Sequence, residues 1–328
     1  MKKFVLGIDI GGTKTAIVLG DSNFKEEPSK LIVDKLAFPT NSDRGYKTVI
    51  NEIFETADEI LEANEIKVKD LHSIGISCGG PLDSEKGIIY SPPNLPDWDA
   101  VEITRMFKER FGVKTFLQND ANACALAEWH FGAGRGYRNM IFLTFGTGMG
   151  AGLILDGKLY TGANDMAGEV GHIRLAEEGP LGYGKEGSFE GFCSGGGIAR
   201  LGKSLAKEEL TKGNKPSFCK SFDELENITA KSIAVSAKEG DATAQKVYET
   251  CGEYLGRGLA VLIDILNPQA IVIGSIYERS GELLEKAMYS ALNKESLPLS
   301  LSACKILPAA LGDSIGDFAA LGVALSGI

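Results

Sequence analysis

Two glycine turns at corresponding places in the two halves of the chain constrain its fold more than any other feature. The first, DIGGTK at residues 9–14, lies between two apolar runs that together span residues 4–21. The second lies in MIFLTFGTGMGAGLILDG, residues 140–157, where Gly146 stands 135 residues after Gly11. Because glycine adopts the positive φ angles of tight turns, each copy predicts a β-hairpin. The second half of the chain therefore restarts the architecture of the first.

The first turn also carries groups that can bind phosphate. Glycines let backbone N–H groups approach phosphate oxygens closely, and this turn adds an acid, a hydroxyl and a lysine. A Gly-Gly hairpin taken alone is more often a structural turn than a binding site. The P-loop pattern is absent, since Lys14 does not directly follow its glycine and an apolar strand comes next. Two matched turns facing each other across a cleft would nevertheless suit the phosphate chain of a nucleotide.

Composition restricts the class of protein and of partner. The 328 residues suffice for two domains, and 44% hydrophobic with 24% charged residues is typical of a globular protein. The net charge of −10 argues against a nucleic-acid partner, because such binding depends on Lys and Arg. No segment reaches the roughly 18 apolar residues of a membrane span, and the first residues resemble no secretion signal. We expect a cytoplasmic protein with no membrane or nucleic-acid partner.

The order of the elements predicts an α/β architecture with largely parallel strands and an antiparallel hairpin at its start. Helices are expected over 49–61 and 101–111, followed by a long helix that ends before Pro268 and a last helix with Asp313 as its N-cap. Strands are expected over 73–77, 113–118 and 270–274. Residues 207–226 are polar and irregular, and we expect a surface loop there.

Asp120 is the candidate general base. It lies in QNDANACALAEWHF, residues 118–131, at the carboxyl end of a predicted strand, where α/β sheets place their ligands. Taken alone, an acid in front of an alanine-rich helix is as readily a helix cap. As a base it would accept the proton of an attacking hydroxyl, which suits phosphoryl transfer.

A third cluster lies in residues 167–191, where Glu169, His172 and Glu190 stand among glycines. By itself His172 would be an ordinary surface or packed histidine, and Glu169 an ordinary solvated acid. Together they suggest polar groups that converge on a hydroxyl-rich ligand.

At this point the sequence resembles the ROK family of sugar kinases, named for repressors, uncharacterised reading frames and kinases. The resemblance implies the two-lobed actin-like, ribonuclease H-like ATPase fold. It covers essentially the whole chain and rests on six segments in the family's order: DIGGTK at 9–14, GGPLD at 79–83, PNLPDW at 93–98, NDANA at 119–123, FGTGMGAG at 145–152 and AGEVGH at 167–172.

The resemblance also implies the role of each candidate residue. Asp120 would activate the 6-hydroxyl of a sugar, and Asp9 would help to position Mg²⁺, through water. Gly274 would lie near the adenosine of ATP. The first phosphate loop would consist of Gly11, Gly12, Thr13 and Lys14, the second of Gly146, Thr147 and Gly148, and the sugar-binding set of Asn94, Asn119, Glu169, His172 and Glu190.

Two departures from the family pattern stand out. Most members bind a structural zinc ion through three cysteines that follow the histidine, but the matching positions here are Leu181, Tyr183 and Ser188. We therefore expect no zinc, and packing of Tyr183, Phe189 and Phe192 in its place. The glycine cluster on the adenosine side is also thinned to GSIYE, residues 274–278.

The leading hypothesis is an ATP-dependent kinase acting on the 6-hydroxyl of a hexose, with glucose favoured. N-acetylmannosamine, N-acetylglucosamine, mannose and fructose remain alternatives. The rival class is a sugar-responsive ROK regulator, which the resemblance implies would carry a DNA-binding domain before the kinase-like part. Only eight residues precede Asp9 here, and the negative net charge also argues against DNA binding. We expect a small lobe of residues 1–118 and 309–328, and a larger lobe of residues 119–308 that carries Asp120. The sequence leaves a homodimer open.

Overall fold

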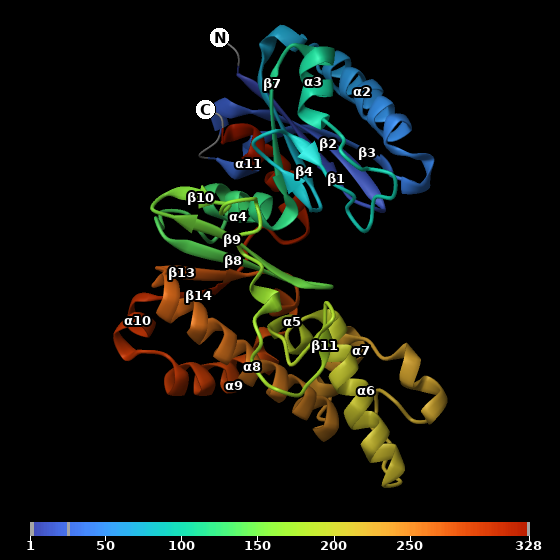
Figure 1. Cartoon of the computed structure of the whole chain (residues 1–328), viewed down its shortest axis with the longest axis vertical. Coiled ribbons are helices and arrows are strands. Elements are labelled where there is room, and N and C mark those ends of the chain that lie inside the picture. Colours follow the sequence, from blue (N-terminus) through green and yellow to red (C-terminus); the bar gives the residue numbers. More distant parts are fainter. Residues whose placement is uncertain (1–2, 25–26, 327–328) are drawn as a thin grey trace. The chain divides into compact units, whose positions relative to one another are not determined.

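The first glycine turn joins two neighbouring strands of a five-stranded sheet with the order β3-β2-β1-β4-β7 (Figure 1). β1 pairs antiparallel with β2, and β2 with β3, whereas β1, β4 and β7 run parallel. The predicted hairpin and the parallel strands after it are confirmed. The strands are β1 (Phe4–Ile10), β2 (Lys14–Asp21), β3 (Ile32–Pro39), β4 (Leu71–Cys78) and β7 (Lys114–Asn119).

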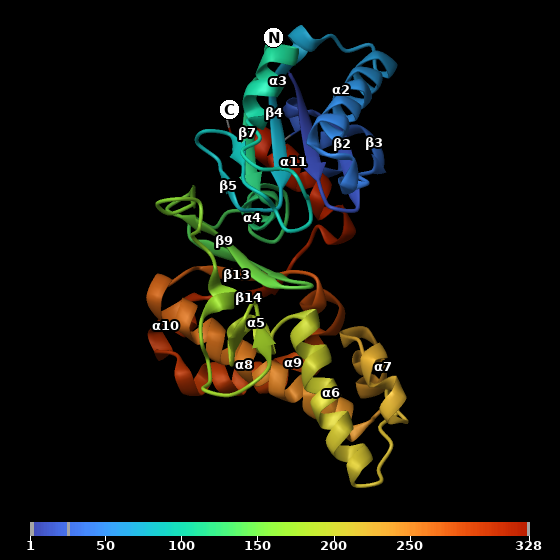
Figure 2. The same cartoon turned by 45° about the vertical axis from the view of Figure 1, so that its right-hand side comes forward.

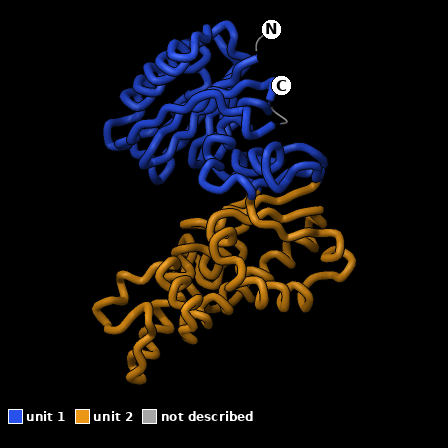
Figure 3. The backbone as a smooth tube through the Cα atoms, turned by 180° about the vertical axis from the view of Figure 1, so that it is seen from behind, with its two compact units in different colours: residues 1–138, 152–167, 310–328 blue, residues 139–151, 168–309 orange. Residues whose placement is uncertain are grey.

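The structure is a computed structural model that describes residues 3–24 and 27–326. Its chain forms two units, coloured separately in Figure 3. Unit 1 comprises residues 1–138, 152–167 and 310–328, and unit 2 comprises residues 139–151 and 168–309. The functional lobes expected from the sequence, with their boundary after residue 118, stay a prediction.

Helices cover both faces of the sheet in unit 1 (Figures 1 and 2). On one face lie α2 (Tyr46–Ala63) and α3 (Ile103–Phe111), whose Phe54 and Phe107 rings meet edge to face at 4.9 Å. On the other lies α11 (Ile315–Leu325), which reaches the strands because the sheet carries glycine there. A Cβ at Gly75 would lie only 2.1 Å from the backbone nitrogen of Ala324.

A second five-stranded sheet has the order β10-β9-β8-β13-β14. β9 pairs antiparallel with β10, and β8, β13 and β14 run parallel. Each sheet thus joins antiparallel strands at one end to a run of parallel strands, which confirms the repeat read from the two turns. The strands are β8 (Met140–Phe145), β9 (Met149–Leu155), β10 (Lys158–Tyr160), β13 (Ala270–Ile273) and β14 (Lys305–Pro308).

Two long helices pack closely in unit 2. They are α8 (Ala242–Leu266) and α9 (Ile276–Glu295), and a Cβ at Gly256 would lie 2.3 Å from the carbonyl oxygen of Met288. Glycine therefore sets the separation of these helices. Among the described residues, no helix is long and apolar enough to span a membrane.

Two local predictions are wrong. Helix α6 (Gly195–Thr211) runs into the expected loop of residues 207–226, and its first turn is capped by the Ser194 hydroxyl, which accepts from the Gly197 N–H. The last helix begins at Ile315 with Ser314 at its N-cap position, whereas Asp313 lies in the preceding 3₁₀ turn.

The remaining elements are short, apart from two helices of nine and twelve residues. They are α1 (Pro28–Leu31), α4 (Asp120–Phe131), α5 (Phe189–Phe192), α7 (Ala230–Lys238), α10 (Pro298–Ala303), β5 (Leu82–Asp83), β6 (Ile88–Ile89), β11 (Leu181–Gly182), β12 (Lys185–Glu186), and the 3₁₀ turns η1 (Ser22–Phe24), η2 (Ser42–Arg44), η3 (Val68–Asp70), η4 (Val170–His172), η5 (Phe222–Asn227) and η6 (Gly312–Ser314).

Candidate active site

The first glycine turn leaves backbone donors available for a ligand. The Gly11 N–H donates to the Lys14 carbonyl at 3.0 Å, and the Thr13 carbonyl accepts from the Thr40 N–H at 2.9 Å. Within the described part of the chain, the N–H groups of Gly12 and Thr13 donate to no protein acceptor. Such paired N–H groups at a tight turn are the usual means by which a backbone binds an anion.

Asn94 lies directly beside this turn. A Cβ at Gly12 would stand 2.8 Å from the carbonyl oxygen of Asn94, so only glycine fits there. The loop is anchored by the side chains of Leu95 and Trp98, which are fully buried, whereas Asn94 itself is exposed. The structure therefore places the Asn94 amide next to the first turn, where it can reach a ligand.

Asp9 lies at the carboxyl end of β1, opposite Ser77 of β4. The pKa of this carboxyl is raised to about 6, mainly by burial and then by the negative charges of Asp317 and Asp120, while a hydrogen bond with Ser77 acts to lower it. Asp317 in turn forms an ion pair with Lys35 at 2.6 Å. Asp9 is thus an acid held among other acids, an environment that favours a bound cation.

Asn119 and Asp120 have different roles in the start of α4. The side chain of Asn119 accepts from the Asn122 N–H at 2.8 Å and so caps the helix, while Asp120 is its first residue. The capping interpretation therefore belongs to Asn119 rather than to Asp120. The Asp120 side chain is exposed at the surface, yet the surrounding protein atoms remove enough water to raise the pKa of its carboxyl. A raised pKa at an accessible carboxylate suits a base.

The second glycine turn joins β8 to β9 and is fixed from two sides. The Gly146 carbonyl accepts from the Gly195 N–H at 2.7 Å, which ties the turn to the first residue of α6. Gly274, at the end of β13, donates its N–H to the Leu143 carbonyl at 3.1 Å. A Cβ at Gly146 would lie 3.5 Å from the Ser275 hydroxyl. Unit 2 therefore brings Gly146 and the Gly274–Ser275 segment together.

Glu190 links the turn to the third cluster. Its carboxylate accepts from the Met149 N–H at 3.0 Å, and the same oxygen lies 2.8 Å from a Cβ placed on Gly148. A Cβ on Gly171 would lie 3.2 Å from the Cβ of Glu190. Gly171 is buried, whereas Glu169, two residues before it, and His172, directly after it, are exposed. Glu190 is thus common to the second turn and the third cluster.

Protein contacts hold the loop that follows His172. The Lys185 ammonium donates to the His172 carbonyl at 2.7 Å, and the Phe192 ring stacks on Tyr254 with centroids 3.5 Å apart. Phe189 is fully buried. The expectation for Tyr183 is wrong, because its residue is 83% exposed and meets only the edge of the His172 ring, at a centroid distance of 6.3 Å.

The candidate residues therefore form two sets, one in each unit. Unit 1 brings together the first turn, Asp9, Asn94, Asn119 and Asp120. Unit 2 brings together the second turn, Glu169, His172, Glu190 and Gly274. No group of three or more His, Cys, Asp or Glu side chains arranged to hold a metal ion occurs within residues 3–24 and 27–326.

Sequence reasoning missed several residues that shape the site. Ser77, Asp317 and Thr40 all touch or perturb candidate residues in unit 1. The only signal for Ser77 is its place near the end of a predicted strand. Asp317 and Thr40 are far in sequence from the residues they influence, and no local pattern marks them.

Comparisons with known proteins bear on the family of the chain. The ROK family model matches residues 5–325. A glucokinase from Halalkalibacterium halodurans is 32% identical over 316 residues, 96% of this chain and 92% of the relative. A glucokinase from Thermotoga maritima is 34% identical over 281 residues, 85% of this chain and 84% of the relative.

A solved structure gives the same result for the fold. The ROK family glucokinase from Streptomyces griseus, in complex with glucose and AMPPNP, superposes with a TM-score of 0.72 at 27% identity and covers 99% of this chain and 100% of its own. The chain thus has the actin-like, ribonuclease H-like fold that its resemblance to the ROK family implies. On the family match and the identities above, the chain belongs to the ROK family.

Proposed function

We propose that the protein is an ATP-dependent hexose kinase that phosphorylates the 6-hydroxyl of glucose. One structural relationship supports this most strongly. The turn with free N–H groups follows β1, Asp9 is the last residue but one of the same strand, and Asp120 follows the parallel strand β7 of the same sheet. The charge of Asp120 also acts on Asp9. A phosphate-binding turn, an acid for a cation and an accessible base at one sheet edge are the parts that phosphoryl transfer requires.

Asp120 is the proposed general base. Its carboxylate accepts the proton of the 6-hydroxyl as that oxygen attacks the γ-phosphorus of ATP, and the terminal phosphoryl group passes to the sugar while ADP leaves. Asn119 next to it keeps the helix start in place through its cap. The raised pKa of Asp120 brings the base closer to neutral pH, where general-base catalysis is most effective.

The proposed sugar-binding set draws on both units: Asn94 and Asn119 from unit 1, and Glu169, His172 and Glu190 from unit 2. Amide, imidazole and carboxylate groups pair well with vicinal hydroxyls. A site built to hydrogen-bond hydroxyls rejects analogues that lack them.

ATP is the proposed phosphoryl donor. Its phosphates would be bound by the N–H groups and Lys14 of the first turn and by Gly146, Thr147 and Gly148 of the second, with Gly274 on the adenosine side. Asp9 fits the accompanying Mg²⁺, because a carboxyl whose pKa is raised by burial and by neighbouring acids gains most from a nearby cation. The ion supplies charge neutralisation for the phosphates. A cytoplasmic location and a homodimer remain predictions, as does the absence of zinc.

The test is a comparison of kcat/KM for glucose, mannose, fructose, N-acetylglucosamine and N-acetylmannosamine at fixed ATP and Mg²⁺. We expect glucose to give the highest value, consistent with the glucokinases that the chain resembles. A higher value for either acetamido sugar would overturn the choice of glucose but keep the kinase. No phosphorylation of any of the five would overturn both.

A further inference from the structure

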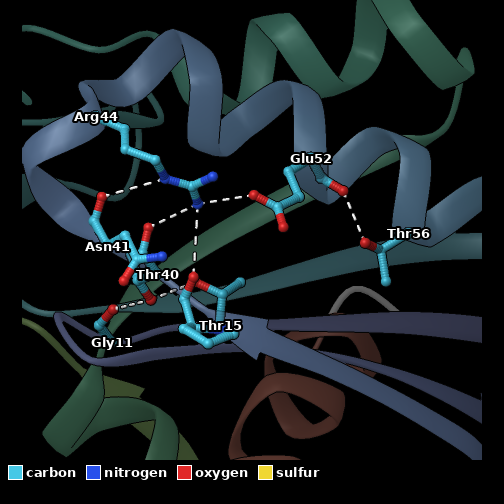
Figure 4. Close-up of polar contacts among 8 residues, drawn as sticks. Gly11, Thr15, Thr40, Asn41, Arg44, Glu52 and Thr56 are labelled. Carbon is cyan, nitrogen blue, oxygen red and sulfur yellow. Dashed lines mark hydrogen bonds and ion pairs between the residues drawn. The ribbon is translucent and has the colours of Figure 1, made fainter.

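The first glycine turn is held in place by Thr40, a residue outside all the recognised segments (Figure 4). The Thr40 hydroxyl donates to the Gly11 carbonyl at 2.6 Å, and its backbone N–H donates to the Thr13 carbonyl at 2.9 Å. One residue thus fixes the carbonyls on both sides of Gly12. The side chain of Thr40 is fully buried, so these bonds are shielded from water.

The two bonds set the direction of the turn's donors. In a planar trans peptide the C=O and N–H groups point in opposite directions. Because the Gly11 carbonyl points to Thr40, the Gly12 N–H points away from it, and the same argument places the Lys14 N–H opposite the Thr13 carbonyl. Thr40 therefore fixes the direction of the Gly12 N–H, one of the two donors of the turn that have no protein acceptor among the described residues.

A second layer keeps Thr40 itself in position. The single proton of the Thr40 hydroxyl goes to Gly11, so the buried Thr15 hydroxyl, 2.9 Å away, donates to Thr40. Arg44 donates to the Thr40 carbonyl at 2.9 Å and forms an ion pair with Glu52 of α2 at 2.7 Å (Figure 4). The turn is thereby connected to a long helix that packs on the sheet.

We propose that Thr40 is a positioning residue for the phosphoryl donor. It orients the first phosphate turn without touching the nucleotide, an inference that rests on the proposed kinase function. Positioning errors of about 1 Å can cost on the order of a hundredfold in rate, so loss of one such bond has a measurable effect. Buried hydroxyls with both partners present also favour a single geometry over several.

The test is the affinity for AMPPNP with Mg²⁺, measured by calorimetry. The temperature lies about 15 °C below each variant's Tm, roughly three times a typical mutational shift of Tm. Thr40→Val keeps the shape but removes the hydroxyl, and Thr40→Ser restores it. We expect the first to weaken AMPPNP binding about tenfold and the second to stay within about twofold of the parent, with glucose affinity unchanged in both.

Thr56→Val is the matched control. The Thr56 hydroxyl donates to the Glu52 carbonyl within α2 and has no contact with the turn. If Thr56→Val lost as much AMPPNP affinity as Thr40→Val, the effect would be a general structural one and the proposal would be overturned. A parallel loss of glucose affinity in Thr40→Val would overturn it for the same reason. Unchanged AMPPNP binding in Thr40→Val would overturn it as well.

Arg44→Gln gives a second variant, because the Arg44 side chain is partly exposed and its loss is tolerable for folding. It should weaken AMPPNP binding in the same direction, by about threefold, and an unchanged affinity counts against the proposal. If the parent binds AMPPNP but none of these variants differs, only the role of Thr40 fails. If the parent binds no AMPPNP, the kinase assignment fails with it.

Discussion

The carboxylate of Glu190 accepts a hydrogen bond from the backbone N–H of Met149 at 3.0 Å. Met149 is the first residue after the second glycine turn, and Glu190 belongs to the proposed sugar-binding set. One carboxylate oxygen therefore supports the turn, and the proposed function assigns the other to a sugar hydroxyl. Glu190 thus connects the proposed phosphate-binding turn to the proposed sugar-binding set.

Substitution of Glu190 should separate these two roles. Glu190→Gln retains a carbonyl oxygen for the Met149 N–H but lowers the strength of bonds to the sugar, so KM for glucose should rise about tenfold while KM for ATP stays within about twofold. Glu190→Ala leaves the N–H without its acceptor and should raise both.

The exposed Glu186 on the same loop gives the control, since Glu186→Gln should change neither constant. Equal effects of Gln and Ala at position 190 on the KM for ATP would argue against a support role for its carboxylate.

Asp9 should destabilise the folded protein at neutral pH. The pKa of this carboxyl rises from 3.8 to about 6 on folding, so its contribution to stability is full below 3.8 and is lost as the pH rises through about 6. Asp9→Asn cannot ionise. Without nucleotide, the Tm of Asp9→Asn should match that of the parent near pH 4 and exceed it at pH 7.5. The corresponding gain in unfolding free energy at pH 7.5 has an upper limit of about 3 kcal/mol.

Thermal unfolding from pH 4 to 8 measures this difference. Glu55→Gln, at an exposed position of α2, should show no such trend. If the parent were more stable than Asp9→Asn at pH 7.5, the prediction would be wrong, because the folded protein would then stabilise the charge of Asp9.

The loop after His172 should need no metal. Its Phe192 side chain is 3% exposed and stacked on Tyr254. Phe192→Ala should lower the unfolding free energy by about 3–5 kcal/mol, whereas Tyr183→Ala, at an exposed position, should cost less than about 0.5 kcal/mol.

Denaturant unfolding measures both variants, and EDTA should leave the Tm of the parent unchanged. Elemental analysis that finds one zinc ion per chain, or a clear drop of Tm with EDTA, would contradict this explanation of the loop.

The sequence predicted the features that depend on local pattern. The two hairpins follow from glycine between apolar runs, and α4 follows from its alanine-rich segment, although the residue that caps it is Asn119 and not Asp120. The third strand, Ile32–Pro39, escaped prediction because it alternates half-buried and exposed residues and carries charged side chains. Three consecutive glycines at 195–197 concealed the start of α6, which a cap and packing stabilise in spite of low helix propensity.

The site was predictable only in part, for a related reason. Asp120 and the glycine turns have local signals and a family resemblance. The pKa of Asp9 depends on Asp317, and the turn on Thr40, which the chain brings close only on folding. Such long-range contacts leave no spacing in the sequence from which to infer them.

The most direct test of the kinase assignment is the reaction of ATP with glucose, followed by ³¹P NMR, for the parent and for Asp120→Asn. The account predicts that the parent forms glucose 6-phosphate and ADP in equal amounts. Asp120→Asn should bind glucose within about threefold of the parent but turn over at least about a hundredfold more slowly, because its amide cannot accept the proton. Phosphate at another hydroxyl, ATP hydrolysis without a sugar product, or an Asp120→Asn rate close to that of the parent would contradict it.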